Sequence, residues 1–326
     1  MTQRIVSLLP SATEIICALG ARAELVGVSH ECDFPADVVG LPVLTKPKIR
    51  TDAPSGQIDR DVREVVKQAL AVYDLDVDAL RSLAPDVIVT QDICDVCAVS
   101  FPQVQEAAKS IVGKDVKVVN LHPERLADIW ADIRKVASAL GREAAGEALL
   151  GSMDARVKAV SDRAQRTSTR PSILTIEWID PIMIGGTWMP ELAERCAAKA
   201  LVTTAGQKAP TLTKPQLEAL DPDLVIVKPC GFPLDRTLAE IPTLRKNLPW
   251  EDWDAPLNGL VYLCDGNQYF NRPGPRIVDS LEILAACIHP KQFRDFRQKY
   301  AKWVAEVSLD ESLKRWDEEY IGIEGV

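Results

Sequence analysis

The sequence predicts an α/β protein made of two parallel-sheet lobes that are joined by a long helix. Short apolar, β-branched runs alternate with helical patterns along the chain. Such runs, buried on both faces and separated by helices, are typical of parallel strands in βα units. In addition, LRSLAPDVIVTQ (80–91) recurs as LEALDPDLVIVKP (217–229). Each copy holds a helix end, a Pro-Asp turn and a buried strand, so the repeat indicates two lobes of similar build.

The first lobe is expected to cover residues 1–121. Its opening stretch, RIVSLLPSATEIICALG, predicts a strand, a turn and a helix, with Ser11 or Thr13 near the helix N-cap. Three further apolar runs predict the remaining buried strands of this lobe: LVGVS (25–29), DVIVTQ (86–91) and VKVVNL (116–121).

Residues 122–170 are predicted to be linking helices. Apolar residues at helical spacing mark the first of them: Leu126, Ile129, Trp130, Ile133 and Val136. A second helix follows a break at Gly141 and runs to about Gln165. Because a helix rises 1.5 Å per residue, about 24 residues span on the order of 36 Å. This helix can therefore cross between the lobes as a stiff strut.

The second lobe is expected over residues 171–289, with strands in SILTIEW (172–178), DLVIVKP (223–229) and LVYLCD (260–265). Residues 290–326 are predicted to be a C-terminal helical extension. The prediction depends on a stripe at helical spacing: Phe293, Phe296, Tyr300, Trp303, Val304 and Val307. This stripe either packs on the second lobe or docks a partner.

Composition excludes several classes of protein. Hydrophobic content of 47% and charged content of 26% are those of a soluble globular chain. The net charge of −9 comes without a basic block, which argues against nucleic acid as a partner. No apolar run approaches the roughly 20 residues of a membrane span. Because Pro10 and Glu14 interrupt the first apolar stretch, it does not resemble a secretory signal, and we expect a cytoplasmic protein.

The loops that follow the predicted strands are candidate walls of one site, because ligands of open α/β sheets bind beyond the carboxyl ends of the strands. These loops hold few lysines and many aromatic residues: Phe34, Phe101, Trp178, Trp188, Phe232, Tyr269 and Phe270. If the lobes face each other, the rings line a cleft suited to a large, flat, partly apolar ligand. Alternatively, each ring plugs the end of its own sheet.

Polar residues occur in the same loops: His30, Glu31, Asp33, Glu177, Asp265, Gln268, Arg272 and Arg276. Arg276 stands where the helical pattern PRIVDSLEILAACI begins, and a cation there opposes the helix dipole. An acidic group should therefore compensate it. That group is either on a ligand or on the protein, for example Asp279.

Four of the eight cysteines also fall in these loops: Cys32, Cys94, Cys97 and Cys230. Thiolates and the imidazole of the nearby His30 are ligands of zinc, and four thiolates can hold an iron-sulfur cluster. One C-x-x-C without a second pair leaves other roles open, namely inert thiols, redox-reactive thiols or contact with an organic ligand. A nucleophilic thiolate paired with His30 is a weaker alternative, because no nucleophile motif surrounds Cys94 or Cys97.

Several stretches in order resemble the cobalamin-binding proteins among the substrate-binding components of ABC importers. The resemblance covers residues 4–288 and is carried by RIVSLLPSATEIICALG, LVGVSHECDFP, the two P-D-hydrophobic-I-V strands, the interlobe helix and YFNRPGPR. It implies two α/β lobes, a rigid connecting helix and a ligand between them. It further implies that Tyr269 and Phe270 lie near the corrinoid with Arg272 and Arg276 beside it, and that Phe34 ends the first-lobe loop. The chain departs from the family pattern at Glu31, Gln91 and Gln268, in its cysteines, and in having no export signal.

The leading hypothesis is a non-catalytic protein that binds cobalamin, or a similar corrinoid or metal chelate, for cytoplasmic handling or for delivery to an ABC importer. Its expected partners are this small molecule and an importer or a corrinoid acceptor, without nucleic acid or membrane insertion. The candidate ligand-binding residues are His30, Glu31, Phe34, Gln91, Glu177, Trp178, Trp188, Phe232, Gln268, Tyr269, Phe270, Arg272 and Arg276. The alternative is a sensing or catalytic protein with a zinc or iron-sulfur site at Cys32, Cys94, Cys97 and Cys230.

Overall fold

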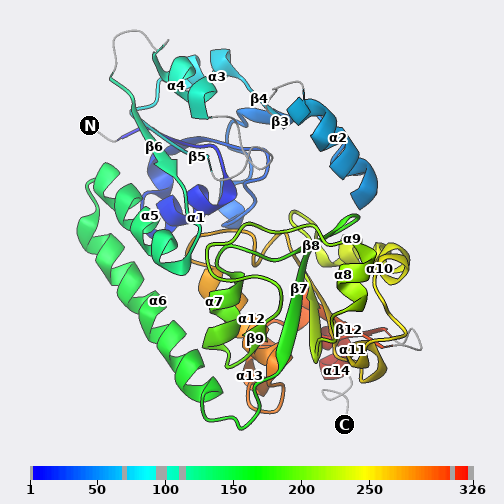
Figure 1. Ribbon diagram of the computed structural model, residues 1–326. Helices are drawn as coiled ribbons and strands as arrows, with labels where there is room; N and C mark the ends of the chain where they lie inside the picture. The colour runs from blue at the N-terminus through cyan, green and yellow to red at the C-terminus, as the bar shows by residue number, and fades with distance from the viewer. Residues whose placement is uncertain (1–2, 68–71, 93–100, 110–114, 309–312, 322–326) are drawn as a thin grey trace. The chain divides into compact units, whose positions relative to one another are not determined.

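The computed structural model describes residues 3–67, 72–92, 101–109, 115–308 and 313–321 (Figure 1). Contacts within the chain group it into two compact units. The first consists of Met1–Ala53, Gln57–Met153 and Pro273–Pro275, and the second of Pro54–Gly56, Asp154–Arg272 and Arg276–Val326. Both units combine parallel strands with helices, so the predicted α/β class is confirmed.

The sheet of the first unit has four parallel strands in the order β2-β1-β5-β6. They are β1 (Ile5–Ser7), β2 (Leu25–Val28), β5 (Val87–Gln91) and β6 (Lys117–Leu121). All five residues of β5 are buried, as the apolar run predicts for a central parallel strand. A separate antiparallel ribbon pairs β3 (Thr45–Pro47) with β4 (Tyr73–Leu75).

The helices of the first unit follow the predicted βα order. They are α1 (Pro10–Ala18), α2 (Ser55–Lys67), α3 (Val77–Leu83), α4 (Phe101–Lys109) and α5 (Leu126–Ala139), with short 3₁₀ turns at η1 (Arg22–Glu24) and η2 (Ala36–Val38). Helix α1 starts one residue before the predicted Ser11, because Pro10 occupies its first turn with φ already set for a helix. Leu9 is its N-cap and makes no side-chain cap.

The second unit contains a seven-stranded mixed sheet in the order β13-β12-β11-β10-β7-β8, with β9 paired to β7. Strands β7 (Ser172–Ile179), β10 (Leu224–Val227) and β11 (Val261–Cys264) form its parallel centre, and β9 (Lys199–Ala200) also runs parallel. Strands β8 (Ile182–Ile184), β12 (Val304–Val307) and β13 (Leu313–Arg315) are antiparallel to their neighbours.

Helices cover both faces of this sheet (Figure 1). On one face lie α8 (Lys214–Glu218), α9 (Leu234–Ala239), α10 (Ile241–Asn247) and α11 (Asp254–Leu257). On the other lie α7 (Met189–Arg195), α12 (Ile277–Ile288) and α13 (Arg294–Lys299). Leu174, Val225 and Leu263 pack against Leu217, Leu234 and Leu244, so alternate strand residues face the first group of helices.

The C-terminal segment differs from its predicted form. In the part of this segment that the structure describes, α13, a 3₁₀ turn at η3 (Ala301–Trp303) and α14 (Trp316–Ile321) are helical, whereas Val304 and Val307 belong to strand β12. The helical prediction is wrong there because β12 pairs antiparallel with β11, with Val307 opposite Val261. This pairing fills one side of β11, and β13 pairs in turn with β12, so both strands belong to the sheet.

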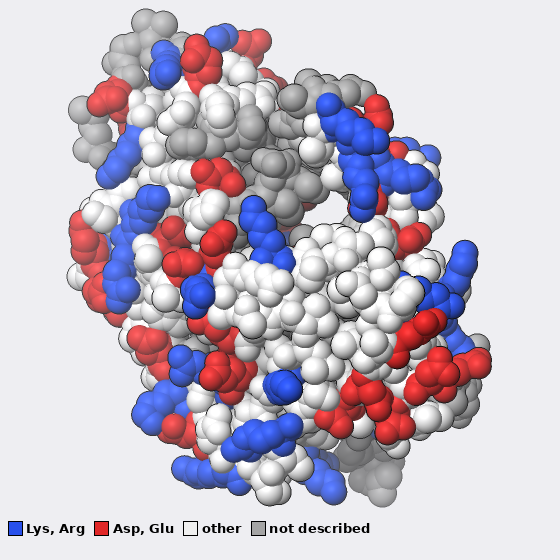
Figure 2. Space-filling model, viewed as in Figure 1, with Lys and Arg blue, Asp and Glu red and all other residues white. Residues whose placement is uncertain are grey.

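Helix α6 (Glu143–Ala164) is an uninterrupted helix of 22 residues that crosses the boundary between the two units at Met153 and Asp154. Its extent agrees with the helix predicted from Gly141 to about Gln165. Among the described residues, no helix is long and apolar enough to span a membrane. Basic and acidic side chains are interspersed on the face shown in Figure 2.

Candidate functional site

A buried lysine lies at the carboxyl edge of the second unit's sheet. Lys228 directly follows β10 and is 1% exposed. Its Nζ donates to Glu177 Oε2 and to Asn271 Oδ1, both at 2.9 Å. The amide of Asn271 in turn donates to the backbone oxygens of Lys228 (3.1 Å) and Gly266 (2.8 Å). The ends of β7, β10 and β11 are thereby joined by one polar network, of which sequence analysis identified only Glu177.

The loop after β11 is fixed by the carboxylate of Asp265. It accepts hydrogen bonds from the backbone N of Leu234 (3.2 Å), Asn267 (3.1 Å) and Gln268 (2.7 Å). Burial raises the pKa of Asp265 above its usual value, and these hydrogen bonds oppose the rise. Asp265 therefore shapes the loop that carries Gln268 and Tyr269.

Both predicted arginines belong to this loop region. Arg276 Nη1 donates to Gln268 Oε1 at 2.9 Å, and its guanidinium lies 5.6 Å from the ring centre of Tyr269. Arg272 is buried and donates from Nη2 to Asn267 Oδ1 at 3.0 Å. Asp279, the protein group suggested for Arg276, instead accepts hydrogen bonds from Arg156 (2.5 Å) and Tyr300 (2.8 Å).

The predicted aromatic residues of the second unit differ in exposure. Trp188, Phe232, Tyr269 and Phe270 are buried, and Phe270 has no exposed surface. Trp188 donates from Nε1 to the backbone oxygen of Phe270 at 2.9 Å. Trp178 is half-buried at the end of β7 and packs edge-on against Phe232 at 5.1 Å. Of these rings, Trp178 therefore offers the most surface to a ligand.

In the first unit, polar side chains meet where β2 ends. His30 Nδ1 lies 2.7 Å from Thr45 Oγ1, and the His30 ring packs edge-on against Tyr73 at 4.8 Å. Tyr73 donates to Glu31 Oε1 at 2.7 Å. Neither Thr45 nor Tyr73 was identified from the sequence, because both lie on the β3–β4 ribbon, which does not belong to the predicted parallel sheet. Burial lowers the pKa of His30, with the charge of Glu31 opposing this.

The remaining candidate site residues of the first unit do not form a common hydrogen-bond network like that around His30. Phe34 is 41% exposed, whereas Gln91 is buried as the last residue of β5. Cys32 is buried, and Thr13 Oγ1 lies 3.1 Å from its sulfur. Asp33 is half-buried.

The proposed metal site is only partly represented. Cys94 and Cys97 lie outside the described residues, and the side chain of Phe101 does too. Cys32 belongs to the first unit and Cys230 to the second. Within the described residues, no group of three or more His, Cys, Asp and Glu side chains is placed to hold a metal ion. The structure thus gives no support to a zinc or iron-sulfur site among them.

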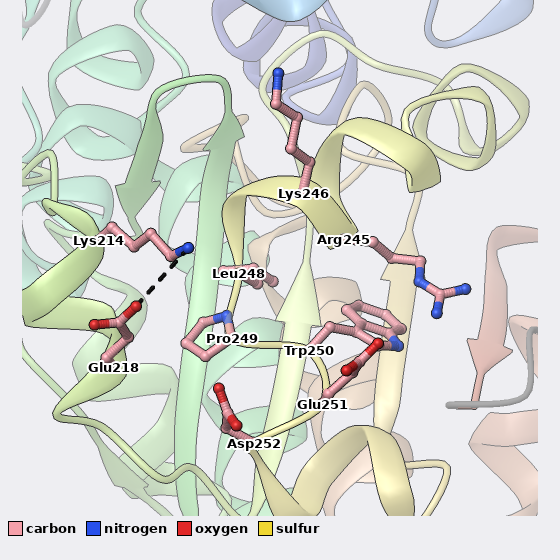
Figure 3. Close-up of a pocket in the computed structure, with 9 residues that line it drawn as sticks. All are labelled: Lys214, Glu218, Arg245, Lys246, Leu248, Pro249, Trp250, Glu251 and Asp252. Atoms are coloured by element: carbon pink, nitrogen blue, oxygen red, sulfur yellow. Dashed lines mark ion pairs between the residues drawn. The ribbon is translucent and has the colours of Figure 1, made fainter.

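A pocket of about 380 Å³ lies on the second unit, away from the strand-following loops (Figure 3). Its walls come from α8, the end of α10 and the segment after α10. Lys214 and Glu218, 3.9 Å apart, form an ion pair at one side, and Arg245 and Lys246 belong to another wall. None of its residues is a predicted ligand contact.

Comparison with known proteins adds three findings. A model of the family described as "Periplasmic binding protein" matches residues 5–267. An uncharacterized ABC transporter substrate-binding lipoprotein of Bacillus subtilis, YvrC, is 24% identical over 300 residues, which are 90% of this chain and 82% of the relative.

Solved structures share the fold at low sequence identity. A periplasmic heme-binding protein from Pseudomonas aeruginosa superposes with a TM-score of 0.66 at 22% identity, covering 89% of this chain and 94% of that one. The periplasmic vitamin B12-binding protein BtuF of Vibrio cholerae gives 0.61 at 17% identity, covering 91% and 98%. At these identities the likeness shows the fold alone.

Proposed function

The chain belongs to the periplasmic binding protein family, whose members bind small molecules for ABC importers, and we propose that its ligand is a metal-containing tetrapyrrole, with cobalamin as the first candidate. The two solved relatives named above bind heme and vitamin B12 respectively, which supports this ligand class. The family also corrects one expectation. The prediction of a cytoplasmic protein is wrong, because the proteins of this family are periplasmic or extracellular and the matched relative is a lipoprotein of an ABC transporter.

The observation that carries the proposal is the chemistry of the carboxyl edge of the second unit's sheet. Trp178 supplies a partly exposed ring, and Tyr269 lies beneath the guanidinium of Arg276. Around them stand the amides of Gln268 and Asn267. Large planar ligands are bound by aromatic surface together with a few oriented polar groups.

Cobalamin is placed before heme because its peripheral amide groups can pair with both the donors and the acceptors of this edge, whereas the carboxylates of heme can pair only with the donors. The arginines of this edge already donate to amide oxygens of the protein, at Asn267 and Gln268. Ligand amides can accept from the same guanidinium groups and donate to Glu177. In the first unit, His30, Glu31 and Phe34 are the proposed contacts.

Titration with cyanocobalamin, hydroxocobalamin and hemin, followed by absorbance and calorimetry, tests the proposal. We expect saturable binding of one corrinoid per chain. Trp178→Ala should weaken it by about fivefold, since a ring contact of this kind contributes on the order of 1 kcal/mol. Trp130→Ala is the matched control, because Trp130 lies on α5 outside the strand-following loops.

Two results would change this view. Tight binding of hemin without corrinoid binding would replace cobalamin by heme as the ligand. Absence of binding of all three compounds at high micromolar concentration would remove the tetrapyrrole proposal.

A further inference from the structure

The three histidines of the chain have different hydrogen-bonding environments. His122 Nδ1 lies 2.5 Å from Asp92 Oδ1, and His289 Nε2 lies 2.9 Å from the backbone oxygen of Cys196. His30 is partnered only at Nδ1. Its Nε2 is buried and has no hydrogen-bond partner in the described part of the chain. An unsatisfied buried nitrogen lowers the stability of a fold, so this atom is a candidate for contact with a ligand.

The hydrogen bonds around Thr45 determine which ring nitrogen of His30 carries the proton. The Thr45 hydroxyl donates its single hydrogen to Ser29 Oγ at 3.0 Å. Its oxygen therefore accepts at both remaining contacts, from the backbone N of His30 (3.1 Å) and from His30 Nδ1 (2.7 Å). Because Nδ1 is protonated, Nε2 holds a lone pair.

The same surroundings hold the ring in place, and burial lowers the pKa of His30, which favours the neutral imidazole. Tyr73 packs edge-on against it with an interplanar angle of 73°. Tyr73 also holds Glu31, whose Oε1 lies 3.9 Å from His30 Nε2, too far for a hydrogen bond. A neutral imidazole that donates from one nitrogen and is oriented by its neighbours is the usual form of a metal-ligating histidine.

A free metal ion does not fit this position. His30 and Glu31 offer two ligands, and no third His, Cys, Asp or Glu completes such a group in the described residues. Zinc takes four ligands, magnesium takes six and calcium takes six to eight. A metal that reaches His30 must therefore bring most of its ligands with it, as the central metal of a tetrapyrrole does.

We propose that His30 Nε2 is the axial ligand of the metal ion at the centre of the bound tetrapyrrole. This inference rests on the proposed function and adds to the proposed site one coordination bond, between His30 Nε2 and the metal of the ligand. The Nε2 lone pair forms a bond to the metal, and a water or hydroxide bound on that side leaves. The imidazole gives up no proton and the metal keeps its oxidation state. Thr45 is a positioning residue that sets the tautomer and the ring orientation.

The test compares wild-type protein with His30→Ala, using hydroxocobalamin, hemin and iron-free protoporphyrin IX as probes. Coordination by imidazole should shift the visible absorption bands of the metal complex bound to wild-type protein. In His30→Ala this shift should be lost, and affinity for the metal complex should fall by about 10–100-fold. Affinity for the iron-free macrocycle should be equal in both proteins. His122→Ala, at a half-exposed histidine, should behave as wild type.

Thr45 provides a second arm that does not remove the histidine. Thr45→Val cannot accept from Nδ1, so we expect weaker binding and a smaller spectral shift, whereas Thr45→Ser should restore both. Circular dichroism checks that each variant is folded. Binding with identical spectra in wild type and His30→Ala would overturn the axial ligand and leave the proposed function intact. If wild-type protein binds neither metal complex, the proposed function itself fails, and the coordination bond fails with it.

Discussion

Lys228 is a charged side chain that the fold can hold in its interior because its ammonium group is paired with a carboxylate and hydrogen-bonded to an amide oxygen. Its ammonium group bonds to Glu177 and Asn271, and only the Glu177 side chain of this pair of charges, 29% exposed, reaches solvent. A lysine at the end of an apolar strand pattern is typical of a surface residue, so the burial of Lys228 was not predicted from the sequence. Its position in the chain could have indicated this burial, because Lys228 directly follows a strand that is buried over its full length.

Replacing Lys228 by methionine should destabilise the protein. The variant leaves the Glu177 carboxylate beside a buried apolar chain, and breaking such a pair costs roughly 3 kcal/mol, the low end of the range because Glu177 is partly solvated. Urea denaturation followed by tryptophan fluorescence measures the loss. Lys208→Met, at an exposed lysine of the same unit, is the control and should unfold as wild type does. Equal stability of both variants would show that the ion pair contributes nothing.

Asp132 makes the stability of the folded protein depend on pH. Burial raises its pKa to about 6, against an opposing hydrogen bond from the backbone N of His122 (3.1 Å). Because the folded state holds this proton more tightly than the unfolded state, the contribution of Asp132 to stability is present at pH 4 and is lost as the pH rises to about 6.

Asp132→Asn keeps an acceptor for the same hydrogen bond and cannot titrate. We therefore expect the unfolding free energy of this variant, relative to wild type, to increase as the pH is raised from 4 to 6. Denaturation curves at several pH values measure the difference. A difference in unfolding free energy between the two proteins that stays constant with pH would show that Asp132 does not cause the pH dependence.

Among the secondary-structure elements, the positions of the buried strands could be predicted from the sequence better than the pairing between strands. The apolar runs at 86–91, 223–229 and 260–265 became β5, β10 and β11, because a strand buried on both faces must be apolar throughout. The run at 304–307 was misread as helix. A short apolar run has no decisive period, and its partner β11 lies more than 40 residues earlier, which no local pattern reveals.

The C-terminal strands should therefore be essential to the second unit. Trp316 follows β13, is fully buried, packs edge-on against Tyr262 of β11 and donates to Glu306 Oε1 at 2.9 Å. Trp316→Ala should lower the unfolding free energy by about 3–5 kcal/mol. Leu313→Ala, at a residue 43% exposed on β13, is the control and should cost far less. A mild effect at Trp316 would mean that this segment is only loosely attached.

The grouping of residues at one sheet edge was easier to predict than their contacts. Glu177 lies near the end of β7, and Gln268 and Arg276 follow β11, because parallel strands bring their carboxyl ends to one edge of the sheet. The contacts of His30 with Thr45 and Tyr73 could not be foreseen, since they depend on a ribbon whose two strands lack any distinctive sequence pattern. Burial of Phe270, whose φ is +69°, likewise depends on its backbone conformation.

For the whole molecule, α6 is a long helix whose first half belongs to one unit and whose second half belongs to the other. A continuous helix absorbs less change in φ and ψ than a loop hinge. We therefore expect ligand addition to change the radius of gyration little in small-angle scattering. Ser152→Pro, at an exposed position inside α6, removes a helix hydrogen bond and should permit a larger change. Ser152→Ala is the control for the proline variant and should behave as wild type. A large decrease in the radius of gyration of the wild-type protein would contradict the prediction that α6 is a stiff connection.

The late position of β12 in the chain has a consequence for biosynthesis. Nearly all of the first unit is synthesised by the time Met153 is added, so its sheet can form while translation of the second unit continues. The second unit cannot cover the open side of β11 until β12 has left the ribosome. Nascent chains stalled before that point should expose an unpaired strand and be bound by chaperones, whereas chains that include β12 and β13 should be released.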